Sequence, residues 1–275
     1  MPATTTPVPQ TPGPGPHAGP GNGYRDGRPA ARPAPRLFHP TVARLTYRAL
    51  LGRRRALLLC GLPLLLLVIS VAVRALTGAD DSTANDMLQG FALSTMVPLV
   101  GVIAGTGAIG PEIDDGAIVY LLAKPVSRST IVFTKFVVAI GVVAVFSAVP
   151  TLIAGIILNG NGQNIAVAFG VAAAVASVAY AAIFLMLGVL TRHAVIAGLV
   201  YALVWESVIG NVVPGARTLS VQQWALAVAQ KTAHGGIVSS DVGLPTAIVL
   251  LAVVTVAATW FAGRKLRTLK LAGEE

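Results

Sequence analysis

Six uninterrupted apolar runs constrain the fold of this chain more than any other feature. A helix rises about 1.5 Å per residue, so about 20 residues cross the roughly 30 Å of hydrocarbon in a lipid bilayer. Each run is close to that length or longer. The sequence therefore predicts an all-α integral membrane protein with six transmembrane helices, at about Ala56–Val73, Leu88–Gly110, Ile131–Leu158, Ile165–Leu190, Ala194–Val213 and Val242–Ala262.

The composition excludes an ordinary soluble domain. Hydrophobic residues make up 55% of the 275 residues and charged residues 11%, with a mean hydropathy of +0.75, whereas about 25% of a soluble domain is charged. The net charge is +9, but Lys and Arg flank the apolar runs instead of forming a groove with aromatic residues, so no nucleic-acid partner is expected. Cys60 is the single cysteine, so an intramolecular disulfide and a Cys-x-x-Cys metal site are excluded.

Composition also divides the chain along its length. Residues 1–36 are rich in proline and glycine and poor in large apolar side chains, which predicts a disordered tail. In residues 37–55, apolar and arginine side chains recur on different faces at helical spacing, which predicts an amphipathic helix at the membrane interface. Residues 56–263 form the six-span domain, and residues 264–275 form a basic and then acidic C-terminal tail.

The distribution of basic residues predicts the orientation in the membrane. If the N-terminus is cytoplasmic, only three of the 20 Lys and Arg residues fall outside, namely Arg74, Arg217 and Lys231. Because cytoplasmic loops carry an excess of Lys and Arg, both termini are expected in the cytoplasm. In the last outside segment, Val221–Ala229 is interpreted as a short helix at the outer interface, with Trp224 as its anchor.

A polar segment of 25 residues, 111–135, separates the second and third apolar runs and lies in the first cytoplasmic loop of this topology. Pro111 suits a first helical position, acidic residues follow it, and Lys124 precedes Pro125, so a short capped helix is predicted. Its apolar stripe at i, i+3 and i+4 consists of Ile118, Leu121 and Leu122. Such a helix can dock on another protein or rest on the membrane surface, and its own chemistry leaves both open.

The order of residues in this segment resembles that of type-2 ABC transporter permeases. The matching elements are Gly110, Glu112, Gly116, Leu121, Leu122, Pro125, Arg128 and Lys135, whereas Pro111, Ala117 and Thr134 depart from the family pattern. The order of spans, the amphipathic N-terminal helix and the basic C-terminus resemble the same family across residues 37–270.

The resemblance implies a permease subunit in the plasma membrane of a bacterium, paired with a second copy or a paralogue and with a separate ATPase. The implied contacts with that ATPase are Glu112, Asp114, Asp115, Gly116, Leu121, Leu122, Lys124, Pro125 and Arg128. ATP and Mg²⁺ are expected on the ATPase, because this chain has no GxxxxGK[ST] phosphate cradle. The chain itself is expected to be no enzyme and to hold no cofactor or metal. The family implies export, and the apolar spans favour a hydrophobic or amphipathic substrate.

Small residues near the end of the second run have two interpretations. Gly105-Thr-Gly107-Ala-Ile-Gly110 matches GxGxxG, but it follows no predicted strand and no acidic residue lies about 20 positions later, so nucleotide binding is rejected. Gly101 and Gly105 instead form a GxxxG pair for close helix packing, either within the chain or across a permease dimer.

Glu206 is the one acidic residue well inside a predicted span. Charge in hydrocarbon is costly and is often functional. Glu206 is expected either to line a substrate path or to pair with Arg217 or Arg74 near the outer interface. The alternative function, a secondary ion-coupled carrier, would use Glu206 in a proton or ion relay.

Overall fold

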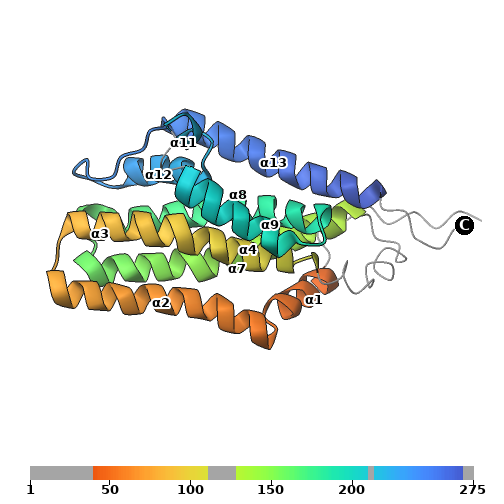
Figure 1. Cartoon of the computed structure of the whole chain (residues 1–275), viewed down its shortest axis with the longest axis horizontal. Coiled ribbons are helices and arrows are strands. Elements are labelled where there is room, and N and C mark those ends of the chain that lie inside the picture. The colour runs from red at the N-terminus through yellow and green to blue at the C-terminus, as the bar shows by residue number, and fades with distance from the viewer. Residues whose placement is uncertain (1–39, 111–127, 210–213, 269–275) are drawn as a thin grey trace, which may run out of the picture. The chain divides into compact units, whose positions relative to one another are not determined.

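The computed structural model describes residues 40–110, 128–209 and 214–268 (Figure 1). These residues form helices joined by short turns and include no β-strand. They all belong to one unit, Pro35–Glu275. An all-helical chain is the expected result for long apolar segments, because a helix satisfies its backbone hydrogen bonds internally.

Five helical stretches are long and apolar enough to cross a membrane. They are α2 (Arg53–Thr77), the continuous stretch α3–η1–α4 (Asp81–Met87, Leu88–Met96 and Val97–Gly107), α7 (Arg128–Asn159), α8 (Ile165–Leu190) and α13 (Leu244–Thr268). The chain is therefore a multi-pass membrane protein.

The predicted fifth span is shorter than expected in the part of the chain that the structure describes. There α9 (Ala194–Val200) passes directly into η3 (Tyr201–Ile209), a π-helix, and residues 210–213 lie outside the described ranges. The apolar stretch Ala194–Glu206 falls below the length of a full span. The number six is therefore not established by the described residues.

Helix α8 lies at the centre of the helix packing. It contacts α4, α7, α12 (Val221–Thr232) and α13, and 67% of its most apolar window is buried, against 22% for α2 and 17% for α13. Most of its buried residues are alanine, glycine or serine, and these small side chains let several helices approach closely. By contrast, α2 and α13 leave most of their apolar side chains exposed, as helices that face lipid do.

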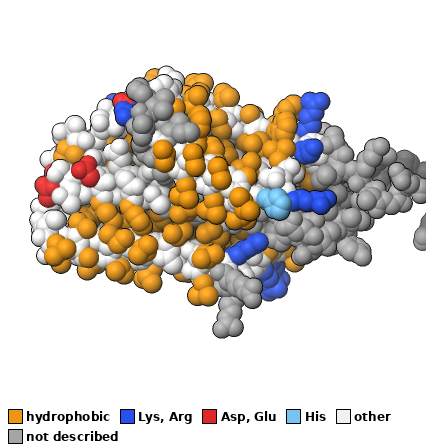
Figure 2. Space-filling view, viewed as in Figure 1, with side chains coloured by type: hydrophobic (Ala, Val, Ile, Leu, Met, Phe, Trp, Pro, Cys, Tyr) orange, Lys and Arg blue, Asp and Glu red, His pale blue; other side chains and the backbone are white. Residues whose placement is uncertain are grey.

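The N-terminal helix α1 (Pro40–Leu50) has one buried face and one basic face. Its buried residues, Val42, Thr46 and Leu50, are spaced four apart, and the helix packs against α7 and α4. Arg44 and Arg48 are exposed. In Figure 2 most of the visible Lys and Arg side chains lie at the end of the helices where α1 lies and α13 ends, and most Asp and Glu lie at the other end.

The short helix predicted at Val221–Ala229 is confirmed, but the role of Trp224 as its anchor in the lipid interface is wrong. Helix α12 forms there, but eight of its 12 residues are buried, and it packs against α8, α13 and η1. Trp224 is 3% exposed and its Nε1 donates to the Thr218 carbonyl oxygen 2.8 Å away. Neighbouring helices cover Trp224, so this side chain does not face lipid.

Candidate functional site

The end of α4 lies just before the predicted coupling segment along the chain. The last carbonyl groups of a helix lack partners within the helix and carry its negative dipole end. Here Arg55 Nη1 donates to the Gly107 carbonyl oxygen at 3.0 Å, and Lys135 Nζ donates to the Ala108 carbonyl oxygen at 2.6 Å. Arg55 comes from α2 and Lys135 from α7, so two cations from two helices hold this end.

Lys135 is fully buried. A buried ammonium group is stable only when it is hydrogen-bonded, because removal from water costs several kcal/mol. The Ala108 carbonyl supplies one of its bonds. Since α2, α4 and α7 also contact one another, the two cations link three neighbouring helices at the same end (Figure 1).

The glycines of α4 pack against α8 of the same chain. A Cβ atom added at Gly105 would lie 2.5 Å from Phe184 Cβ, and one added at Gly101 would lie 3.0 Å from Tyr180 Cβ. Distances this short leave no room for a side chain. Of the two packing arrangements considered, the geometry therefore favours contact within the chain, where these glycines serve helix packing and not a nucleotide.

The predicted contacts with the ATPase mostly lie outside the described residues. Glu112, Asp114, Asp115, Gly116, Leu121, Leu122, Lys124 and Pro125 fall in 111–127, and Arg128 is the first residue of α7. The structure describes the flanks of this segment, which are the end of α4 and the start of α7. Lys135, which belongs to the resemblance pattern, joins these two flanks through the Ala108 carbonyl.

A second polar site surrounds Glu206, which is fully buried in η3. Its Oε1 accepts from Tyr201 Oη at 3.0 Å and from the Val221 amide at 3.1 Å. Its Oε2 accepts from Ser220 Oγ at 2.5 Å and from the Gln222 amide at 3.3 Å. The carboxylate thus caps the N-terminus of α12, where free amides and the positive dipole end favour an anion.

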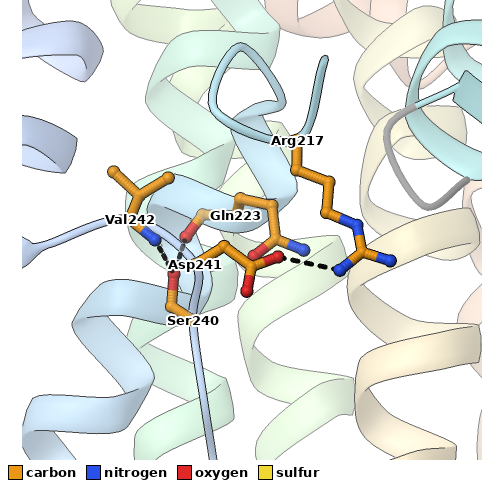
Figure 3. Close-up of polar contacts among 5 residues, drawn as sticks. All are labelled: Arg217, Gln223, Ser240, Asp241 and Val242. Carbon is orange, nitrogen blue, oxygen red and sulfur yellow. Dashed lines mark hydrogen bonds and ion pairs between the residues drawn. The ribbon is translucent and has the colours of Figure 1, made fainter. Parts of the chain in front are cut away.

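The two arginines considered as partners of Glu206 make other contacts. Arg74 donates to the Leu158 carbonyl oxygen at 2.8 Å, at the end of α7. Arg217 forms an exposed ion pair with Asp241 at 3.0 Å (Figure 3). Figure 3 also shows Ser240 next to this pair, where its Oγ donates to the Gln223 carbonyl oxygen at 2.9 Å and so holds the loop before α13 against α12.

Sequence reasoning missed Tyr201, Ser220 and Gln222 as neighbours of Glu206. Ser220 is at the N-cap position of α12 but makes no capping bond of its own. A serine directly before an apolar helical run is a signal for a helix start, but nothing local indicates that the capping oxygen comes from Glu206, 14 residues earlier.

Metal binding has no support in the part of the chain that the structure describes, where no three His, Cys, Asp or Glu side chains form a cluster.

Residues 53–261 match the sequence model of a family described as ABC-2 family transporter protein. No curated protein matches the chain.

Proposed function

We propose, since the chain belongs to the ABC-2 family of transporter proteins, that it couples ATP hydrolysis by a separate ATPase subunit to export of a substrate across the bacterial plasma membrane. Membership makes the chain the membrane-spanning component of an ABC transporter. The separate ATPase, the direction of transport and the orientation with both termini in the cytoplasm belong to the proposal. The working unit is two membrane subunits, two copies or a pair of paralogues, with two ATPases, by symmetry.

The observation that carries the proposal is the pair of cations on the end of α4. Residues 111–127 connect α4 to α7, and Glu112 to Lys124 are the residues proposed to dock on the ATPase. Because Lys135 joins the start of α7 to the Ala108 carbonyl, a force on the connecting segment acts on both helices together. Arg55 passes the same displacement to α2. The three helices then move as one body when the ATPase closes on ATP.

The substrate is proposed to be hydrophobic or amphipathic. The reason is the composition of the spans. Helix α8 carries no charged residue. Glu206, the one acidic residue well inside the predicted spans, accepts hydrogen bonds from the N-terminal amides of α12 and so is not available to a charged substrate.

The alternative of an ion-coupled carrier is not favoured. A relay residue must exchange a proton or ion during transport, whereas Glu206 accepts three hydrogen bonds that hold the start of α12 and another from Tyr201. Its position is that of a structural anion at a helix end. The family match supports the ATP-driven function over the carrier, because the matched family is one of ABC transporter proteins.

The proposal is tested by purifying the tagged full-length chain from its native host in mild detergent and identifying proteins that co-purify by mass spectrometry. The expected result is a near-stoichiometric partner with a GxxxxGK[ST] sequence. The charge reversal Glu112→Lys should reduce that partner's recovery, whereas Asp86→Lys, at an exposed position in α3, should leave it unchanged. Reproducible purification without an ATPase would contradict the proposal.

A further inference from the structure

An open groove lies between α1 and α7. Its volume is about 530 Å³, and its wall is almost entirely apolar. From α1 it is lined by Arg44 and Tyr47, and from α7 by Val138, Gly141 and Val145, with Phe146 at its far end. None of these residues takes part in the contacts at the end of α4 or around Glu206, so the groove is a separate feature.

The groove has the length of one bilayer leaflet. Val138 to Phe146 covers about 12 Å along α7 at 1.5 Å per residue, and half of the hydrocarbon thickness is about 15 Å. It begins one helical turn beyond Lys135, which holds the end of α4. The groove therefore runs from the basic end of the bundle toward the middle of the membrane.

Gly141 widens the floor of the groove. A Cβ atom built on it would meet no heavy atom within 4 Å, in contrast to Gly101 and Gly105, whose missing side chains are replaced by α8. A glycine next to empty space does not serve helix packing within the chain. Its effect here is to leave room beside α7 for something else.

One cation stands at the mouth of this apolar groove. Arg44 is exposed, and no hydrogen bond or ion pair joins it to any residue that the structure describes. Arg48 is exposed one turn later on α1 but does not line the groove. A guanidinium that lines an apolar groove matches a molecule with an anionic head and a hydrocarbon tail, because a guanidinium binds phosphate through paired hydrogen bonds.

We propose that the groove is a binding site for one anionic phospholipid of the leaflet that α1 borders. The phosphate binds Arg44, and one acyl chain lies along α7 over Gly141. A helix from a second protein would have to bring a carboxylate to Arg44, because an unpaired buried charge is costly. The proposal does not depend on the transport function.

The first test measures lipid binding to the full-length chain in mild detergent by native mass spectrometry. Phosphatidylglycerol and phosphatidylcholine with the same acyl chains are titrated separately. The unaltered chain should retain one phosphatidylglycerol at lower concentration than phosphatidylcholine. Arg44→Gln should weaken phosphatidylglycerol binding about fivefold, the effect of one basic residue at a lipid surface, with little change for phosphatidylcholine. The control Arg48→Gln should change neither by more than about twofold.

The second test fills the groove. Gly141→Leu should reduce retention of both lipids, because the new side chain occupies the space of the acyl chain. Gly61→Leu in α2, where an added Cβ also meets no atom within 4 Å, should leave the lipid bound to this site unchanged. Equal binding of the two lipids to the unaltered chain, or unchanged binding in both Arg44→Gln and Gly141→Leu, would overturn the proposal. So would a loss of dimer in Gly141→Leu with lipid binding unchanged, because the groove would then be a protein interface.

Discussion

Replacing Glu206 by alanine is expected to release the N-terminal end of α12 from the bundle. The carboxylate accepts hydrogen bonds from two hydroxyl groups and from the backbone amides of Val221 and Gln222, and both of those residues are buried. The hydroxyl groups can rotate to other acceptors, whereas the two amides are fixed by the helix. The substitution therefore leaves two buried donors without a partner.

The cost can be bounded in two ways. A buried donor left unsatisfied costs about 1–3 kcal/mol, which gives about 2–6 kcal/mol for the two amides. Hydrogen bonds between helices in a membrane protein average about 0.6 kcal/mol each, which gives roughly 2 kcal/mol for four bonds. The two estimates agree at about 2–3 kcal/mol. We expect a cost near the lower end, because in the unfolded chain in detergent the same donors find other partners. Glu206→Gln keeps one acceptor oxygen and should lose about 1 kcal/mol.

Trp224 reports the release directly, because it belongs to α12 and is 3% exposed. In a chain with Trp205→Phe and Trp260→Phe it is the only tryptophan, so its emission follows α12 alone. Glu206→Ala should shift this emission to longer wavelength and lower the free energy of unfolding in a dodecyl sulfate titration. The control is Asp241→Asn, which breaks an exposed ion pair in the same region and should cost at most about 1 kcal/mol.

An unchanged Trp224 emission together with an unfolding free energy within about 0.5 kcal/mol of the parent would refute the capping argument.

ATP-driven transport offers a separate check on the carrier alternative. Glu206→Gln should retain most transport if the carboxylate is structural, and a complete loss with normal folding would return Glu206 to a relay role.

Three further predictions follow from the same structure. Lys135→Met should abolish ATP-driven transport while the ATPase still co-purifies, and should cost about 1.5–3 kcal/mol of stability. The control Lys231→Met, at an exposed site in α12, should change neither transport nor stability. Gly105→Ala should destabilise the chain by about 1–3 kcal/mol, because its Cβ collides with α8, whereas Gly141→Ala should be neutral or stabilising in thermal unfolding. The hydrogen bonds from Ser82 and from the amide and hydroxyl of Thr83 lower the pKa of Asp80 from 3.8 to about 2. The folded pKa lies below the unfolded one, so this cap should persist above pH 3.8 and be lost as pH falls toward 2, as the carboxyl ¹³C shift of Asp80 would report.

The sequence was sufficient to predict the membrane class and most of the helices. Hydropathy is a local property, and a long apolar segment in lipid has few alternatives to a helix, so the ranges of α2, α7, α8 and α13 agree with the predicted runs to within several residues. The family was also accessible, because the resemblance rests on short-range order around residues 110–135, inside the matched range 53–261.

The surroundings of Glu206 show where local reasoning fails. The predicted fifth run is as apolar as a spanning helix, but its described part includes a π-helix with a fully buried carboxylate. That carboxylate, Glu206, ties η3 to the start of α12. A hydropathy window contains no information about such a contact.

The sequence by itself determined that this chain lies in a membrane as helices and belongs to a transporter family, because burial of apolar segments depends only on which residues are adjacent. The tertiary structure decided which surfaces those helices cover. Lys135 bonds to Ala108, 27 residues away, Gly105 packs against Phe184, and Glu206 bonds to Ser220, 14 residues away. Trp224 likewise packs inside the bundle and not at its rim. Contacts over such separations arise from packing among several helices, and that packing is not encoded in any single segment.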